Sequence, residues 1–137
     1  MTCLFYSAPL DVPAERAWKV IEAYSRSAVN IFSTCSNEHA DGDYRVLTLM
    51  RDGVEIEVRE LLLSTDPDNM RHSYTVPGVF GGAEHHHATW QIVTGPDGRA
   101  VFMWATDGYP HDVFEAQRGH YDGLFTQLLA ALNTKEL

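Results

Sequence analysis

Residues 44–60 read YRVLTLMRDGVEIEVRE, a segment that predicts two antiparallel strands joined by Asp52-Gly53. Asp-Gly is a favoured two-residue hairpin loop, so the residues that flank it should face each other across the hairpin. The facing pairs in this register are Arg51–Val54, Leu49–Ile56, Leu47–Val58 and Arg45–Glu60. Side chains alternate along a strand, so these pairs share one face, which is mostly aliphatic and therefore predicted to point inward.

Arg45 and Glu60 are the charged pair on this inward face. Buried charge is costly unless it is paired, so their opposition is consistent with burial. Two interpretations stay open at this point. The pair is either a structural ion pair or a set of polar groups that acts on a molecule held against the sheet.

A second hairpin is predicted at Gly95-Pro96-Asp97-Gly98, which suits a type I turn closed by a left-handed glycine. The resulting three-residue loop gives the facing pairs Trp90–Trp104, Ile92–Phe102, Ala88–Thr106 and His86–Gly108. Both tryptophans then lie on the inner face. They are either part of the core or part of an apolar ligand wall.

The flanking segments predict an α+β protein. Residues 2–10 are typical of a strand, and Asp11-Val12-Pro13 is a helix-start signal with Asp11 as N-cap. A helix should run from Ala14 to about Tyr24, a second short helix over residues 25–32, and strands from Ser33 onward. Apolar residues at helical spacing predict one long final helix over residues 109–132. A sheet of about seven strands curved around that helix leaves room for an internal cavity.

Composition limits the function classes. The 137 residues carry a formal net charge of −9, with 45% hydrophobic residues, which favours a single domain over residues 1–137 and disfavours nucleic acid or an anionic membrane as partner. Cys3 and Cys35 are too few for a disulfide framework and are expected to be small buried residues. We see no signal peptide or transmembrane segment, so we expect a soluble, cytoplasmic protein.

Several fragments together resemble a known family. In chain order they are residues 17–21 (AWKVI), 44–49 (YRVLTL) before Asp52-Gly53, 60–62 (ELL), 71–74 (RHSY), 88–89 (AT), Trp104 and 123–124 (GL). Their order and spacing are similar to the START-related SRPBCC superfamily, in particular its polyketide cyclase/dehydrase-like branch. The resemblance implies the helix-grip fold: a curved antiparallel sheet of about seven strands around a long C-terminal helix, two short helices after the first strand, and an internal cavity.

The resemblance implies a small hydrophobic or lipid-like ligand in that cavity. We expect no cofactor, and a monomer or homodimer. We expect the cavity to be lined by inward residues of the two hairpins and of the last helix. These are Leu47, Leu49, Ile56, Val58, Tyr74, Trp90, Trp104, Leu124 and Leu128.

Histidines are the candidates for chemistry. His85, His86 and His87 are adjacent, but strand alternation turns His86 away from its two neighbours, so we predict no metal site. His86 should point inward, where a neutral imidazole can exchange protons. His72 and Tyr74 share one face of another predicted strand. If that face is inward, an imidazole and a phenol stand in the cavity with Arg45 and Glu60. His111 and His120 are expected on the surface or at a rim.

Three functions are consistent with these observations. The leading hypothesis is binding of a small hydrophobic molecule. The alternative is a polyketide cyclase or dehydratase in which Arg45 supports an oxyanion and Glu60, His86 or His72 act as acid and base. The third is a protein-binding module with a vestigial cavity and an acidic outer face. The glycine-rich segment from Gly78 to Gly82 could form a lid over the cavity mouth.

Overall fold

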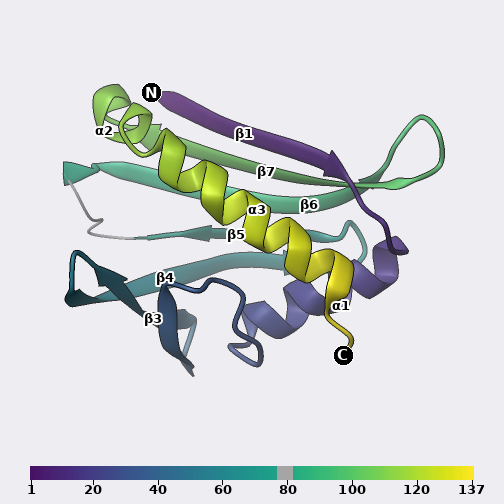
Figure 1. The fold of residues 1–137 in the computed structure, drawn as a ribbon, viewed down its shortest axis with the longest axis horizontal. Helices are drawn as coiled ribbons and strands as arrows, with labels where there is room; N and C mark the ends of the chain where they lie inside the picture. The colour runs from purple at the N-terminus through teal and green to yellow at the C-terminus, as the bar shows by residue number, and fades with distance from the viewer. Residues whose placement is uncertain (77–81) are drawn as a thin grey trace.

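The computed structural model describes residues 1–76 and 82–137. Helix α3 crosses one face of a seven-stranded antiparallel sheet whose strand order is β1-β7-β6-β5-β4-β3-β2 (Figure 1). The elements are β1 (Thr2–Pro9), α1 (Ala14–Ser25), β2 (Cys35–Asp41), β3 (Tyr44–Arg51), β4 (Val54–Asp66), β5 (Arg71–Thr75), β6 (His85–Thr94), β7 (Ala100–Tyr109), α2 (His111–Glu115) and α3 (Arg118–Thr134). The predicted α+β arrangement is confirmed.

The register predicted from Asp52-Gly53 is confirmed. Both turn residues have positive φ, 53° and 75°, as a type I′ hairpin requires. Arg45 faces Glu60 and Leu47 faces Val58, as expected. The inner face of β3 and β4 is buried near these pairs and opens to solvent toward Val54, which is 60% exposed.

The second hairpin is also confirmed, with Trp90 opposite Trp104 and His86 opposite Gly108. Gly98 has φ 82°, and the Gly95 N–H donates to the Arg99 carbonyl at 2.7 Å, which closes the three-residue loop. Trp90 is fully buried, and its ring centroid lies 5.0 Å from that of Tyr24 and 5.9 Å from that of Trp104. These aromatic contacts place Trp90 in the core.

Helix α1 begins where it was predicted, but Asp11 does not cap it. The N-cap is Pro13, without a side-chain hydrogen bond to the helix. The Asp11 carboxylate instead accepts from Arg99 at 3.2 Å, and the Asp11 N–H donates to Asn133 at 2.8 Å. Asp11 therefore ties the start of α1 to the second hairpin and to α3.

The second short helix expected over residues 25–32 does not form. Ser27 adopts the left-handed conformation, with φ 58°, directly after the C-cap Arg26. The Ala28 N–H then donates to the Ala23 carbonyl at 2.8 Å and the Ser27 N–H to the Tyr24 carbonyl at 3.0 Å. This is a Schellman motif, which terminates α1 and turns the chain into an irregular connection to β2.

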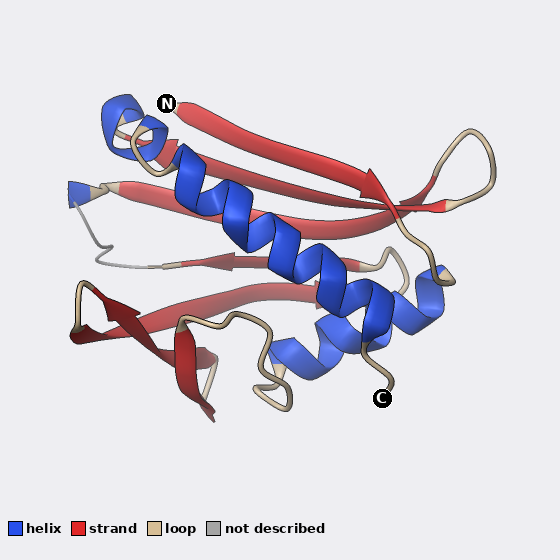
Figure 2. Cartoon of the chain, viewed as in Figure 1, coloured by secondary structure: helices blue, strands red, loops and turns tan. Residues whose placement is uncertain are grey.

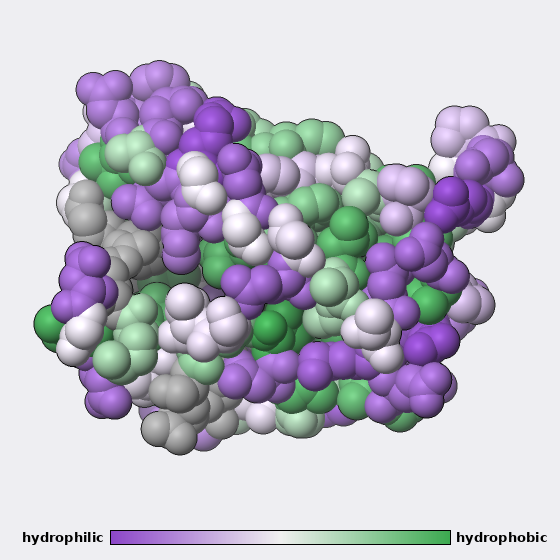
Figure 3. Space-filling view, viewed as in Figure 1, coloured by the Kyte–Doolittle hydropathy of each residue, from purple (hydrophilic) through white to green (hydrophobic). Residues whose placement is uncertain are grey.

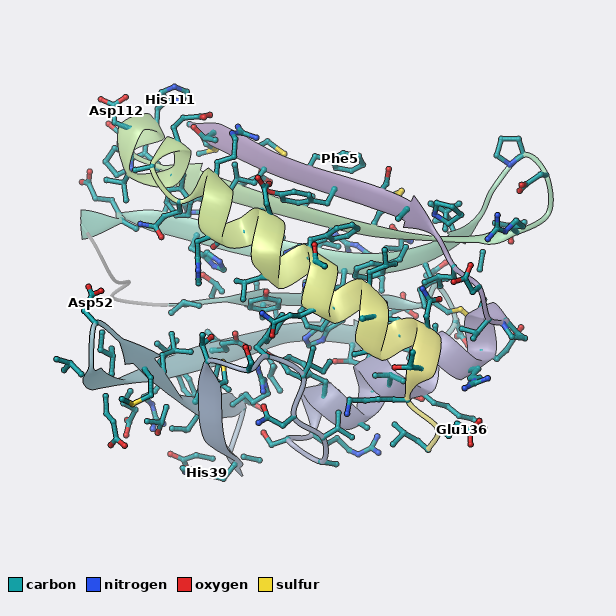
Figure 4. All side chains as sticks on the ribbon, in the orientation of Figure 1. Phe5, His39, Asp52, His111, Asp112 and Glu136 are labelled. Atoms are coloured by element: carbon teal, nitrogen blue, oxygen red, sulfur yellow. The ribbon has the colours of Figure 1, made fainter. Side chains whose placement is uncertain are left out.

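The final helix is divided, which corrects the prediction of one helix over residues 109–132. Strand β7 continues to Tyr109, α2 ends at Glu115, and α3 begins at Arg118 (Figure 2). Phe114 is fully buried and anchors α2 on Gly108 of β7, where an added Cβ would lie only 2.3 Å from the Phe114 ring. His111 and Asp112, labelled in Figure 4, mark α2 beside the start of β1.

The two cysteines differ in exposure. Cys35 is buried, as expected, but Cys3 is exposed, which corrects the prediction for that residue. Leu4 faces the core and Cys3 points to the opposite side of β1, because successive side chains alternate. Among the described residues, no helix is long and apolar enough to cross a membrane.

Candidate ligand-binding site

A cavity of about 80 Å³ lies between the inner face of the sheet and α3. Most of its walls are aromatic or aliphatic, as is typical of ligand pockets. The lining residues are Tyr24, Phe32, Thr34, Cys35, Leu47, Leu49, Val58, Glu60, Tyr74, Val76, His86, Trp104, His120, Tyr121 and Leu124. Apolar residues show in green between polar ones on the side of the molecule that α3 crosses (Figure 3).

Six of the nine predicted ligand residues line this cavity: Leu47, Leu49, Val58, Tyr74, Trp104 and Leu124. The other three do not. Trp90 and Leu128 are fully buried in the core, and Ile56 packs against the core nearer the Asp52-Gly53 turn of the hairpin. The two tryptophans that face each other therefore differ, since Trp104 reaches the cavity wall and Trp90 stays in the core.

Several lining residues were missed because they lie outside the two hairpins. Tyr24 ends the apolar face of α1, Phe32 belongs to the connection into β2, Cys35 is the first residue of β2, and Tyr121 lies on α3. Strand register says nothing about how these segments dock on the sheet. Tyr24 and Tyr121 did carry a signal, because both belong to apolar helical stripes.

Arg45 and Glu60 form a buried ion pair, with Arg45 Nε 3.2 Å from Glu60 Oε1. The Arg45 side chain is fully buried and the Glu60 side chain is 10% exposed. Arg45 Nη2 also donates to the Tyr24 hydroxyl, and its guanidinium carbon lies 3.5 Å from the centre of the Tyr24 ring. Glu60 lines the cavity and Arg45 does not, so the carboxylate is the end of the pair turned toward the cavity.

His86 is buried on the inner face of β6, between Tyr74 and Phe114, with ring centroids 5.8 Å and 6.3 Å away. Its Nδ1 has no hydrogen-bond partner among the described residues. Burial, with smaller contributions from His87 and His85, lowers the pKa of His86 to about 4. The imidazole is therefore neutral at pH 7 and retains one donor and one acceptor nitrogen.

Tyr74 and His72 are both buried on β5, with ring centroids 5.5 Å apart. Burial, reinforced by the Glu60 charge, holds the pKa of Tyr74 well above its usual value. Burial, with a smaller contribution from Arg45, lowers the pKa of His72 to about 4. His72 does not line the cavity. Its Nδ1 lies 3.1 Å from the Thr65 hydroxyl oxygen, and its ring packs between Tyr74 and Trp90 in the core.

The remaining histidines lie as the strand pattern predicts. His85 is exposed and His87 half-buried on the outer face, opposite to His86. Within residues 1–76 and 82–137, no cluster of three metal-ligating side chains is found. His111 and His120 are exposed, and His120 also borders the cavity. The predicted lid between Gly78 and Gly82 falls outside the described residues, except for Gly82 itself.

The site is therefore an apolar pocket with a few convergent polar groups. Neutral Tyr74 and His86 supply hydrogen-bonding atoms, and Glu60 supplies one carboxylate whose charge is compensated by Arg45. Such groups can orient a bound molecule or exchange protons with it.

Comparison with known proteins shows the family to which the chain belongs. The sequence model of the family described as "Polyketide cyclase / dehydrase and lipid transport" matches residues 1–135. No curated protein gives a significant match to the sequence.

Solved structures with the same fold cover almost the whole chain. XoxI from Bacillus cereus superposes with a TM-score of 0.77 at 18% identity, covering 97% of this chain and 94% of the other. Ara h 8.0201 superposes with a TM-score of 0.72 at 13% identity, covering 96% and 97%. A point mutant of norcoclaurine synthase from Thalictrum flavum, in complex with a transition-state analogue, gives 0.69 at 11% identity, covering 96% and 93%. At these identities the likeness concerns the fold.

Proposed function

Since the chain belongs to the polyketide cyclase / dehydrase and lipid transport family, we propose that it binds a small hydrophobic or polyketide-like molecule between its sheet and α3. The observation that carries the proposal is the apolar cavity beneath α3, into which the polar residues Glu60, Tyr74 and His86 converge. Apolar walls supply affinity through burial, and a few polar groups set the orientation of the ligand.

The volume limits the occupant. About 80 Å³ is well below the roughly 300 Å³ of a typical ligand pocket, so the cavity as it stands suits a fragment no larger than one ring. A larger ligand requires lining side chains to move. Leu49 and Leu124 are suited to this, because both are half-buried and lie at the partly open side of the cavity.

A cavity-filling variant tests the proposal. Val58 lines the cavity, and Val54 lies on the same face of β4 but is exposed. We expect the unmodified protein to carry a co-purified ligand in native mass spectrometry and to be stabilised thermally by added polyketides or flavonoids. Val58→Phe should fill the cavity and abolish both effects. The matched control Val54→Phe should bind as the unmodified protein does. Equal binding by both variants would place the ligand elsewhere.

A second candidate is acid–base catalysis of the cyclase or dehydratase type in the same cavity. It is favoured by one observation, the neutral imidazole of His86 beside the Tyr74 hydroxyl-bearing ring. A neutral imidazole can accept a proton from a substrate within hydrogen-bond reach, and its pKa of about 4 makes it a weak base at pH 7. The variant His86→Gln should then lose turnover of a polyketide-type substrate while still binding it. Unchanged turnover would remove His86 from the reaction.

A further inference from the structure

Strand β1 is one of the two edges of the sheet, and on the side away from β7 it pairs with no strand of the described chain (Figure 1). It runs antiparallel to β7 from Thr2 to Pro9 without a register shift. The Leu10 N–H donates to the Ala100 carbonyl at 2.8 Å, which continues the same ladder by one residue. Backbone groups alternate in direction along an antiparallel strand, so even-numbered residues bond to β7 and odd-numbered residues point their N–H and C=O groups toward the free edge.

The two C-terminal helices hold β1 through side chains of its even-numbered residues. The Thr2 hydroxyl bonds to His111 of α2, and the Tyr6 hydroxyl donates to Asp122 of α3 at 2.6 Å. Among the described residues, no side chain forms a hydrogen bond with the backbone of the odd-numbered residues of β1. Those backbone groups are therefore left for solvent or for another chain.

Strand β1 lacks the features that usually keep an edge strand from pairing with another chain, which are charges, bulges and prolines. The opposite edge strand, β2, has a register shift between Ser36 and His39 and carries the exposed Asp41. No charged residue lies on β1, and Pro9 removes a donor only at the last position. The neighbouring strand β7 contributes one charge, Asp107. Of the two edges, β1 is the one at which an added strand can pair.

The exposed side chains of this edge are apolar. Phe5 is 55% exposed and Met1 is 70% exposed, and Figure 4 shows Phe5 beside β1 at the border of the sheet. The chain as a whole has a formal net charge of −9, so two copies repel each other over most of their surface. An uncharged edge with an exposed aromatic ring is where two copies can approach at the lowest electrostatic cost.

We propose that two copies of this chain associate through their β1 edges, antiparallel about a two-fold axis at Phe5. An antiparallel strand pairs with its own copy when the axis passes through its centre, and Phe5 lies midway between Cys3 and Ser7. In this register Phe5 faces the partner's Phe5, and Cys3 faces the partner's Ser7. The N–H groups of all three residues then find acceptors. An axis at Ser7 would instead set Phe5 opposite the partner's Pro9, which has no N–H to donate.

The dimer joins the two sheets into one continuous sheet. The axis is perpendicular to the sheet, so both α3 helices lie on the same face. The contact consists of one strand of eight residues from each copy, which is small beside a standard interface of about 1,600 Å². We therefore expect a weak dimer that dissociates on dilution.

Cysteine cross-linking tests the register. The Cα atoms of a hydrogen-bonded antiparallel pair lie about 5.5 Å apart, a distance that a disulfide spans. In a Cys3→Ser background, Phe5→Cys should give a disulfide-linked dimer on oxidation with diamide. The matched control Ser7→Cys in the same background should stay monomeric, because the two copies of position 7 are separated by about 14 Å along the strands. Cys35 is buried and is present in both variants.

Sedimentation velocity over a range of protein concentrations tests the association of the unmodified chain. We expect a monomer–dimer equilibrium that Phe5→Lys weakens at least about tenfold, because it sets two like charges opposite each other across the axis. Leu63→Lys adds the same charge at a position of similar exposure, 49%, on β4 and should leave the equilibrium unchanged. Circular dichroism verifies that each variant is folded.

Four outcomes would refute the dimer. They are a monomer at every concentration, association that Phe5→Lys does not weaken, cross-linking through Ser7→Cys as fast as through Phe5→Cys, and growth beyond the dimer. Growth of that kind is expected if β1 pairs with β2 of the next copy, because such a contact does not close.

Discussion

The substitution Gly108→Ala tests how α2 is held on the sheet. An added Cβ at position 108 would lie 2.3–2.4 Å from three atoms of the Phe114 ring, far inside van der Waals contact. Phe114 is fully buried and is the one residue of α2 that reaches the core. The ring must therefore move by about 1 Å to regain ordinary contact, and α2 must move with it.

The expected magnitude follows from the cost of overpacking. Forcing a methyl group into a filled core costs roughly 1–3 kcal/mol, and for a chain of this length that lowers the melting temperature by about 3–10 °C. The Phe114 ring also contacts His86, at 6.3 Å between centroids, so its displacement should alter the end of the cavity formed by His86. Smaller residues at position 114 should restore part of the loss in a Gly108→Ala background.

Urea denaturation followed by circular dichroism measures the change, with Gly123→Ala as the matched control. Gly123 is exposed on α3, and a Cβ there would meet nothing within 4 Å. This control should stabilise the protein by up to about 1 kcal/mol, because alanine is the better helix former. A Gly108→Ala variant as stable as the unmodified protein would refute the close packing of Phe114 on β7.

Two further predictions concern buried titratable side chains. His72 and His86 both have a folded-state pKa of about 4, below the usual 6.5, so the unfolded chain takes up protons first as the pH falls. The free energy of unfolding should be constant above about pH 7 and fall between pH 6.5 and 4, by at most about 3 kcal/mol per histidine, and His72→Gln should reduce the slope. Arg45→Met should cost about 3–5 kcal/mol, because it leaves Glu60 buried without its cation, and Arg45→Met/Glu60→Gln should cost less. Urea titrations at several pH values measure both effects. A free energy of unfolding that does not change with pH would contradict the histidine prediction, and equal losses in Arg45→Met and Arg45→Met/Glu60→Gln would contradict the ion-pair prediction.

The parts of the fold that could be predicted are those that depend on neighbours in sequence. Asp52-Gly53 defines its turn, the turn defines the register, and the register brings Arg45 to Glu60 on the inner face. The same local logic placed Trp90 opposite Trp104. In both hairpins, the residue types at the turn carry enough information to orient every side chain along the strands.

The incorrect predictions concern helix ends, where backbone conformation or tertiary packing determines the structure. Serine gives little warning of a left-handed conformation, yet Ser27 terminates α1 with one. Aspartate is a residue type favoured at N-caps, but the Asp11 carboxylate instead accepts a hydrogen bond from Arg99, which is distant in sequence. The break between α2 and α3 follows from the docking of Phe114 on Gly108, and the sequence spacing of apolar residues does not reveal that contact.

The residues of the candidate site also fall into those that strand register predicts and those that depend on tertiary packing. Residues on the hairpins, such as Leu47 and Val58, were placed at the cavity by register alone. The depth of a residue was harder to predict, because alternation gives the side of the sheet and not the distance from α3. Trp90 was therefore indistinguishable from Trp104, and Tyr24 and Phe32, which approach from outside the sheet, were not identified.

The pairing of β1 with β7 has a consequence for the order of folding. Thr2 lies opposite Gly108 and Pro9 opposite Val101, so the first strand to leave the ribosome finds its partner only after about a hundred further residues have been made. The hairpins of β3–β4 and β6–β7 can form earlier from local contacts. Until β1 docks, one side of β7 remains an unpaired strand edge, open to other chains. A nascent chain that stops short of Tyr109 leaves β7 incomplete and β1 without its full partner.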